Sequence, residues 1–203
     1  MGSRDTVAAV VLAAGRSRRM GQAKQLLPLG GSTLLARSLA NVLSSAAGPI
    51  VLVLGFAAEQ IQRDTPTELL ERVTVMIHAE YAEGMSSSLR AGLAAVGSQA
   101  DAALIVLADQ PFVRPETMDA MIEAYRKSSA EIVVPYFKGQ RGNPVLLDRS
   151  VFPAAMNLEG DIGFRAIFGR RSGALLVLDV DDEGVLLDID NREDYERIRS
   201  QQR

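Results

Sequence analysis

Cysteine and tryptophan are absent from the 203-residue chain, and histidine occurs once. Without cysteine there is no disulfide, no thiolate metal site and no cysteine nucleophile, which fits a protein of the reducing cytoplasm. The apolar run from Val7 to Ala14 falls well short of the ~20 residues needed to cross a bilayer. No signal-peptide pattern precedes this run. We therefore expect a cytoplasmic protein without a membrane partner.

An excess of charge of either sign is also missing. The chain holds 22 Lys and Arg against 25 Asp and Glu, for a formal net charge of −3. This balance gives no sign of a nucleic-acid partner. The hydrophobic content of 47% is enough for a sizeable core, and the length fits a single domain.

Apolar runs typical of buried strands alternate with helical patterns along most of the chain. This alternation predicts an α/β fold in which crossover helices cover a mostly parallel central sheet. The run from Val7 is apolar without alternation, as expected for a central strand covered on both faces. The predicted strands are Val7–Ala13, Ile50–Leu54, Val73–Ile77, Ala102–Leu107, Ile132–Pro135 and Leu175–Leu178.

Capping residues and apolar spacing predict the helices between these strands. The first runs from Thr33 to Ser45 with Ser32 as its N-cap, and the last begins after an N-cap at Asn191. Others are predicted after Gly55, after Gly84 and over Pro115–Lys127. Residues 139–173 are interrupted by glycine and proline, and for them we predict an inserted lobe.

A basic loop with two glycines follows the first predicted strand. Gly15 and Gly21 allow positive φ and close approach of a ligand. Four cations lie within nine residues: Arg16, Arg18, Arg19 and Lys24. Since ligands of α/β sheets bind at the carboxyl ends of strands, the loop predicts a triphosphate cradle, with a solvated basic turn as the alternative. The spacing does not match a P-loop, and the chain has no G-x-G-x-x-G.

Two further segments carry polar groups suited to the same ligand. Asp109 ends the buried run at Ala102–Leu107, where a carboxylate would suit a hard cation, although an aspartate before a proline also forms turns. Gly84 precedes three serines at a predicted helix start, whose N–H groups and hydroxyls would bind phosphate or ribose. For His78, we favour a structural role over that of a general base.

These motifs resemble, in order, those of the molybdenum cofactor nucleotidyltransferases, the family of cytidylyltransferases and molybdopterin-guanine dinucleotide synthases. Residues 12–21 read L-A-A-G-R-S-R-R-M-G and are similar to the family's L-A-A-G-x-S-x-R-M-G…K. The L-A-D-Q-P, G-M-S-S-S-L, R-G-N-P-V, G-D-I-G-F-R and D-I-D-N-R-E-D-Y segments resemble further family motifs. The resemblance implies a three-layer Rossmann-like nucleotidyltransferase fold in one domain, 1–203. Its nucleotide-binding half would cover about 1–112 and its acceptor side about 113–203.

The resemblance also implies a role for each matching residue. Arg19, Lys24 and Asp109 would be catalytic, and Mg²⁺ would bind Asp109 and Asp190, with Asp161 as the other candidate ligand. The implied nucleotide contacts are Leu12, Ala13, Ala14, Gly15, Arg16, Ser17, Lys24, His78, Gly84, Ser86, Ser87 and Asp109. The implied acceptor contacts are Arg141, Asn143 and Asp161. The family usually has Asn in place of His78 and His in place of Asn143.

The implied reaction transfers CMP from CTP to the terminal phosphate of a molybdopterin-type cofactor and releases pyrophosphate. Ala14 favours CTP, because the family associates L-A-A-G with cytidine and L-A-G-G with guanosine. A molybdenum hydroxylase would be the protein that receives the product. The alternatives are transfer from GTP, another phosphorylated acceptor, and an oxidoreductase or non-catalytic nucleotide-binding chaperone on the same scaffold.

Overall fold

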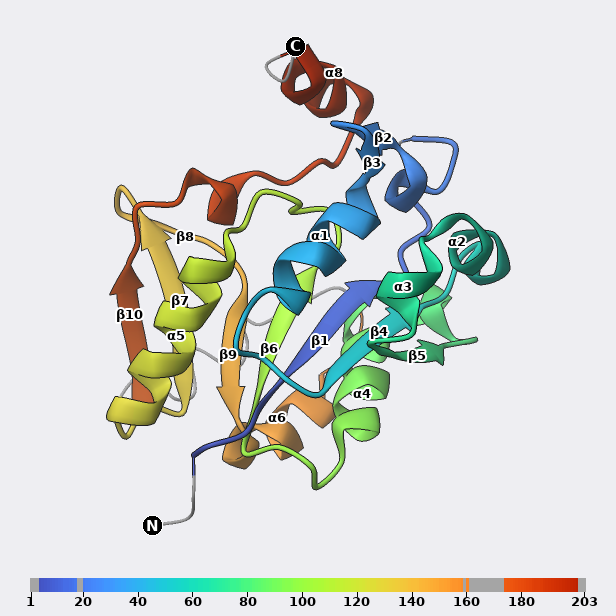
Figure 1. Cartoon of the computed structure of the whole chain (residues 1–203). Helices are drawn as coiled ribbons and strands as arrows, with labels where there is room; N and C mark the ends of the chain where they lie inside the picture. The colour runs from blue at the N-terminus through green and yellow to red at the C-terminus, as the bar shows by residue number, and fades with distance from the viewer. Residues whose placement is uncertain (1–3, 18–19, 159, 161–173, 201–203) are drawn as a thin grey trace.

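The computed structural model describes residues 4–17, 20–158, 160 and 174–200. They form an eight-stranded sheet in the order β10-β7-β9-β6-β1-β4-β5, with β8 paired to β7 (Figure 1). At its centre, β1 (Val7–Ala13) pairs in parallel with β6 (Ala102–Leu107) and with β4 (Ile50–Leu54). On the far side of β4, β5 (Thr74–Ile77) also runs parallel.

The predicted strands are present, and the three central ones have the predicted bounds. Every residue of β1 is buried, because helices cover both faces of the sheet at this point. Two strands run slightly beyond their predicted ends: β7 (Ile132–Phe137) and β10 (Leu175–Asp179). They pair in parallel with each other at the other edge of the sheet.

The prediction of an inserted lobe is wrong for its first part. β9 (Val145–Asp148) lies inside the sheet, antiparallel to both β6 and β7. Its first three residues are buried, but a run so short, next to Pro144, gives little sign of a strand. β8 (Gln140–Arg141) turns back onto β7, and η3 (Arg149–Val151) leads into α6 (Phe152–Met156). Residues 161–173 of the predicted lobe lie outside the described residues.

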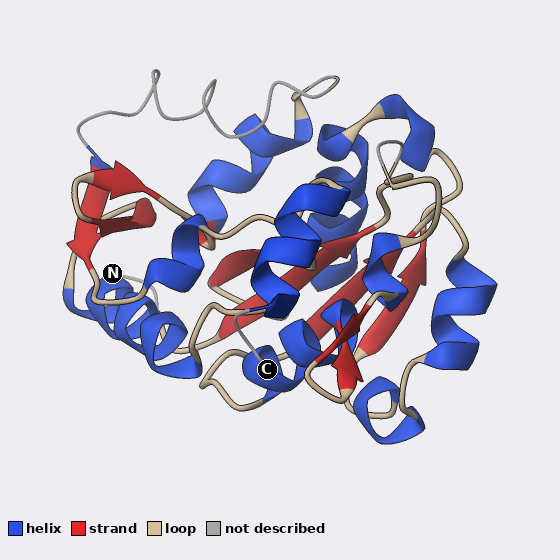
Figure 2. Cartoon of the chain, turned by 90° about the horizontal axis from the view of Figure 1, so that it is seen from above, coloured by secondary structure: helices blue, strands red, loops and turns tan. Residues whose placement is uncertain are grey.

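Helices cover both faces of the sheet (Figures 1 and 2). One face packs against α1 (Leu34–Leu43), α2 (Ala58–Asp64), α3 (Thr67–Leu70) and α5 (Pro115–Lys127). The other face packs against α4 (Met85–Val96) and α6. The predicted three-layer α/β fold is therefore confirmed. None of the helices in the described part of the chain is long and apolar enough to cross a membrane.

The N-cap of α1 differs from the prediction. Thr33 caps this helix, its Oγ1 accepting a hydrogen bond from the backbone N–H of Ala36 at 3.2 Å. Ser32 instead belongs to β3 (Ser32–Thr33), which pairs with β2 (Pro28–Leu29). The prediction was one residue early because Ser and Thr are both good N-caps.

The last helix, α8 (Arg192–Ser200), begins after the predicted N-cap, since Asn191 Oδ1 accepts from the N–H of Asp194 at 2.9 Å. Its Tyr195 and Ile198 join a cluster with Leu29 and Leu34. The Tyr195 hydroxyl also donates to the carbonyl of Pro28 at 2.7 Å. These contacts hold α8 against β2 and the start of α1.

Candidate active site

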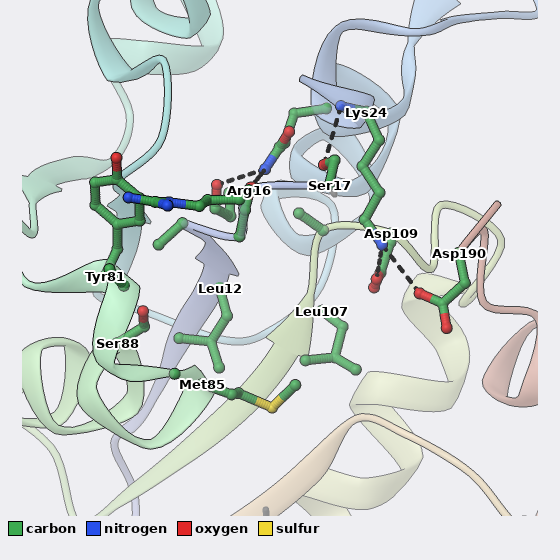
Figure 3. Close-up of a pocket in the computed structure, with 17 residues that line it drawn as sticks. Leu12, Arg16, Ser17, Lys24, Tyr81, Met85, Ser88, Leu107, Asp109 and Asp190 are labelled. Carbon is green, nitrogen blue, oxygen red and sulfur yellow. Dashed lines mark hydrogen bonds and ion pairs between the residues drawn. The ribbon is translucent and has the colours of Figure 1, made fainter. Parts of the chain in front are cut away.

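A pocket of about 440 Å³ opens at the carboxyl ends of β1 and β6 (Figure 3). This volume falls within the range of small-molecule sites. The walls come from the end of β1 and its loop, from η1 (Lys24–Leu26), from η2 (Tyr81–Glu83) with the start of α4, and from the end of β6. Asp190, from the segment before α8, completes the lining. Four distant parts of the sequence therefore meet around one space.

Lys24 lies between two carboxylates at one side of this pocket. Its Nζ donates to Asp109 Oδ2 at 2.5 Å, to Asp190 Oδ1 at 3.1 Å and to the carbonyl of Ile189 at 3.1 Å. Burial alone would lower the pKa of the Lys24 ammonium, but the two carboxylates outweigh burial and raise it. Lys24 therefore stays protonated at neutral pH and carries a fixed positive charge.

A third carboxylate, Asp188, was not identified from the sequence. Partial loss of water around its side chain, together with the negative charges of Asp109 and Asp190, raises the pKa of Asp188 to about 6. Its spacing could have indicated it, because Asp188 and Asp190 flank the buried Ile189. In an extended segment, residues two apart lie on the same side of the chain.

The loop after β1 is held in shape by its own polar contacts. Gly21 has the positive φ that was expected, but Gly15 does not, and Ser17 takes a left-handed conformation with φ of 51°. Ser17 Oγ accepts from the backbone N–H of Lys24 at 3.2 Å. A non-glycine residue in this region is uncommon and is often found at functional sites.

Gln25 is a second residue that sequence reasoning missed. Its side chain is buried, and Nε2 donates to the carbonyls of Ala13 at 2.7 Å and Gly15 at 3.2 Å. These bonds fix the backbone on either side of Ala14, at the start of the loop. No local pattern marks such a residue, because its partners are carbonyls about ten positions away.

The structure brings most of the predicted nucleotide contacts together. Residues 12–17, Lys24, Gly84 and Asp109 all line the pocket. Ser88 lines it as well, whereas Ser86 and Ser87 are buried outside its lining. His78, another predicted nucleotide contact, also lies outside the lining, and its Nε2 is 2.9 Å from Ser87 Oγ. The predicted catalytic Arg19 lies outside the described residues.

Two of the predicted acceptor contacts, Arg141 and Asn143, lie outside the pocket lining. Arg141 is in β8, and Asn143 lies in the turn between β8 and β9. The N–H of Asn143 donates to the carbonyl of Val185 at 3.0 Å, and Gln110 Nε2 donates to the same carbonyl at 3.2 Å. This shared carbonyl links the turn to the segment that contains Asp109. Asp161 lies outside the described residues.

The carboxylates fit a magnesium ion that also binds phosphate. Carboxylate oxygens are hard ligands, and Mg²⁺ in phosphate-transfer sites is commonly held by one or two of them together with substrate phosphates. No group of three or more His, Cys, Asp or Glu side chains within the described ranges is arranged to hold a metal ion. Asp109 and Asp190 would supply at most part of the coordination shell of such an ion, and substrate oxygens or water would have to supply the rest.

Comparison with known proteins identifies a family whose sequences are similar to this chain. The model of the MobA-like NTP transferase domain matches residues 9–175. The purine catabolism protein PucB of Bacillus subtilis is 32% identical, over 94% of each chain. Nicotine blue oxidoreductase of Paenarthrobacter nicotinovorans is 30% identical, over 95% of this chain and 96% of its own. Molybdenum cofactor cytidylyltransferase of Escherichia coli is 25% identical, over 92% of each.

Solved structures show the same arrangement of elements. Rv0371c of Mycobacterium tuberculosis superposes with a TM-score of 0.87 at 32% identity, over 98% of this chain and all of its own. Its complex with manganese gives a TM-score of 0.82 at 30% identity, over 96% and 98%. A nucleotidyl transferase of Methanothermobacter gives 0.80 at 25% identity, over 97% of both chains.

Proposed function

Because this chain belongs to the MobA-like NTP transferase family, we propose that it transfers CMP from CTP to the terminal phosphate of a molybdopterin-type acceptor. The observation that carries the proposal is the charged Lys24, held between Asp109 and Asp190 beside the loop after β1. The similarity to a molybdenum cofactor cytidylyltransferase along nearly the whole chain supports the choice of acceptor. A molybdenum hydroxylase would then be the protein that uses the product.

In this reaction an oxygen of the acceptor phosphate forms a bond to the α-phosphorus of CTP. The bond from that phosphorus to the β-phosphate bridge breaks, and pyrophosphate leaves with the bonding electrons. Negative charge is redistributed over the phosphate oxygens, so positioning and charge neutralisation matter more than a general base. Lys24 would supply positive charge to the α-phosphate, and it would donate a hydrogen bond there by exchanging one of its three present acceptors, Asp109, Asp190 or the carbonyl of Ile189. Arg19 would assist at the pyrophosphate.

Magnesium would bind at Asp109 and Asp190 and would neutralise charge on the phosphate oxygens when present. The two carboxylates have a second task that needs no metal, because they keep Lys24 protonated and directed into the pocket. The manganese complex of a related protein supports a divalent ion in this family.

The choice of CTP rests on Ala14 and its apolar surroundings. Leu12, Ala14 and Met85 all line the pocket and give it apolar surface against which a nucleobase would avoid water. The methyl group of Ala14 would narrow this space against a purine. Steric discrimination of this kind is limited to about 1–3 kcal/mol, so GTP should be a poor substrate and not an excluded one.

An oxidoreductase is the second candidate, because a relative with that name is 30% identical over nearly the whole chain. Against it, the chain has no G-x-G-x-x-G, and the charges at the pocket suit phosphate chemistry. A transferase acting on another phosphorylated acceptor would use the same Lys24 and Asp109.

The test is pyrophosphate release from CTP, GTP and ATP with Mg²⁺ and a molybdopterin-type cofactor. We expect release from CTP that requires the acceptor and falls about 10²-fold or more in Lys24→Ala and in Asp109→Ala. The matched control is Lys127→Ala on α5, because this lysine is exposed and forms its ion pair with Glu123 on the same helix. CTP binding without turnover would disprove this acceptor, and oxidation of a nicotinamide or flavin donor would favour the second candidate.

A further inference from the structure

One wall of the pocket pairs an aromatic ring with a cation from the loop after β1. The Arg16 guanidinium carbon lies 5.3 Å from the centroid of the Tyr81 ring. Figure 3 shows the Arg16 side chain extended across this ring, with Leu12 and Met85 on the same side of the pocket. This is the geometry of a cation–π contact. In the described structure, the guanidinium thus covers one aromatic face.

The Tyr81 ring is placed by packing. The ring of Phe56 meets it edge-on, with centroids 6.5 Å apart and an interplanar angle of 64°. Gly55 lies against it so closely that a Cβ there would be 2.5 Å from Tyr81 Cβ and 2.9 Å from Ala14 Cβ. Tyr81 can therefore approach Ala14 only because residue 55 has no side chain.

We propose that Tyr81 is the surface on which the nucleobase stacks, and that Arg16 covers it until a triphosphate binds. This inference rests on the proposed function, since it requires a nucleoside triphosphate in the pocket. Arg16 lies two residues after Ala14, in the segment expected to hold the phosphates. Its guanidinium binds phosphate oxygens through charge-assisted hydrogen bonds, which are stronger than its cation–π contact with an aromatic face.

Movement of Arg16 to the phosphates would uncover an aromatic face next to the apolar side of the pocket. Nucleobases stack on such faces with little dependence on their identity. Tyr81 would then contribute affinity for the base, while Ala14 would contribute the choice between bases. The Tyr81 hydroxyl points away from Leu12 and Met85 in Figure 3, so the ring and not the hydroxyl would contact the base.

The experiment compares two probes, CTP and inorganic tripolyphosphate, by calorimetry with wild type, Tyr81→Phe and Tyr81→Leu. We expect Tyr81→Phe to bind both probes like wild type. Tyr81→Leu should bind CTP about tenfold more weakly, the loss expected for one aromatic stack. It should bind tripolyphosphate equally well or more tightly, because Arg16 no longer loses a cation–π contact when it moves to the phosphates. Thermal melting of each variant checks that it is folded.

The two probes separate stacking from a structural role. Equal weakening of CTP and tripolyphosphate in Tyr81→Leu would show that Tyr81 only supports the loop, and unchanged CTP affinity would show that the base lies elsewhere. Wild type that binds CTP but releases no pyrophosphate would disprove the proposed reaction, while the affinities would still decide the role of Tyr81. Wild type that binds no CTP would overturn both.

A fluorescence experiment tests the movement of Arg16. Because the chain has no tryptophan, Tyr81→Trp places a unique reporter at this wall. We expect tripolyphosphate to increase quenching by acrylamide as Arg16 leaves the ring, and CTP to decrease it as the base covers the ring. Quenching that changes in the same direction with both probes would contradict the exchange.

Discussion

Two parts of the chain approach Lys24, and they are built in different ways. Asp109 follows β6, which pairs with β1 from Val7–Ala102 to Leu12–Leu107. The sheet therefore places this carboxylate at the mouth of the pocket. Asp190 lies in no strand or helix, on the segment between η5 (Glu183–Leu186) and α8. The position of Asp190 therefore depends on individual hydrogen bonds along this segment and not on a regular ladder of bonds.

Those contacts start from a buried carboxylate. Asp182 accepts from the N–H groups of Arg114 at 2.9 Å and Gly184 at 3.0 Å, and from Thr117 Oγ1 at 2.7 Å. Further along, the N–H of Ile189 donates to the carbonyl of Asp109 at 3.0 Å. A regular sheet positions a side chain through many equivalent hydrogen bonds, whereas the segment from Asp182 to Asp190 depends on a few specific ones. A single substitution should therefore displace Asp190 more readily than Asp109.

The largest expected effect is a difference in activity between variants of the two carboxylates. Asp109→Asn should lower kcat/KM by about 10²-fold or more, and Asp190→Asn by about tenfold, because preorganised charge contributes most at short range. Lys24 Nζ is 2.5 Å from Asp109 but 3.1 Å from Asp190, whose side chain is also more exposed, 44% against 20%. Steady-state pyrophosphate release measures both. Equal losses would mean that the two carboxylates act as one unit.

A second pair of variants compares overpacking in η5, which precedes the Asp190 segment, with overpacking at Gly55, which follows β4. In Gly184→Ala, the new Cβ would lie 2.2 Å from the carbonyl oxygen of Phe112, and in Gly55→Ala 2.5 Å from the Tyr81 side chain. Overpacking costs about 1–3 kcal/mol, and Gly184→Ala should lie at the upper end because backbone yields less than a side chain. Urea unfolding gives both values.

Gly15→Ala is the matched control for these glycines. Nothing lies within 4 Å of a Cβ at this position, and its φ is not positive, so its free energy of unfolding should change by less than about 0.5 kcal/mol. A methyl group directed into the space expected for phosphates should weaken tripolyphosphate binding. A destabilised Gly15→Ala would show that the loop has less room than its geometry indicates.

Helix caps provide a smaller test of the same comparison. Thr33→Ala and Asn191→Ala each remove one capping hydrogen bond and should each cost about 1 kcal/mol of stability. Asn191 directly follows Asp190, so only Asn191→Ala should also reduce kcat/KM. Thermal melting and turnover are measured on the same samples. A loss of activity in Thr33→Ala of the same size would remove the distinction between the two parts.

The smallest expected change is in stability on removal of divalent metal. Lys24 already pairs with both carboxylates, so EDTA should leave the Tm unchanged. Turnover should stop and should recover when Mg²⁺ is added back. A large fall in Tm with EDTA would indicate a structural metal, contrary to the arrangement of the described residues.

Local sequence patterns were enough to predict the three central parallel strands and one of the helices that cover them. The bounds of β1, β4, β6 and α5 follow from apolar runs and from Pro115, because these signals lie within the elements that they specify. The loop after β1 and Asp109 could be proposed as site residues from their places at strand ends, and the structure puts both in the lining of one pocket. The N-cap of α1 was one residue off, since neighbouring Ser and Thr are locally equivalent.

Only the tertiary structure decided the rest. The antiparallel β9 between β6 and β7, the bonds of Gln25 to the loop, and the placement of Asp188 and Asp190 around Lys24 all join residues far apart in the chain. The physical reason is that such contacts depend on which segments meet and in what register. A periodic pattern in a short window carries no information about either.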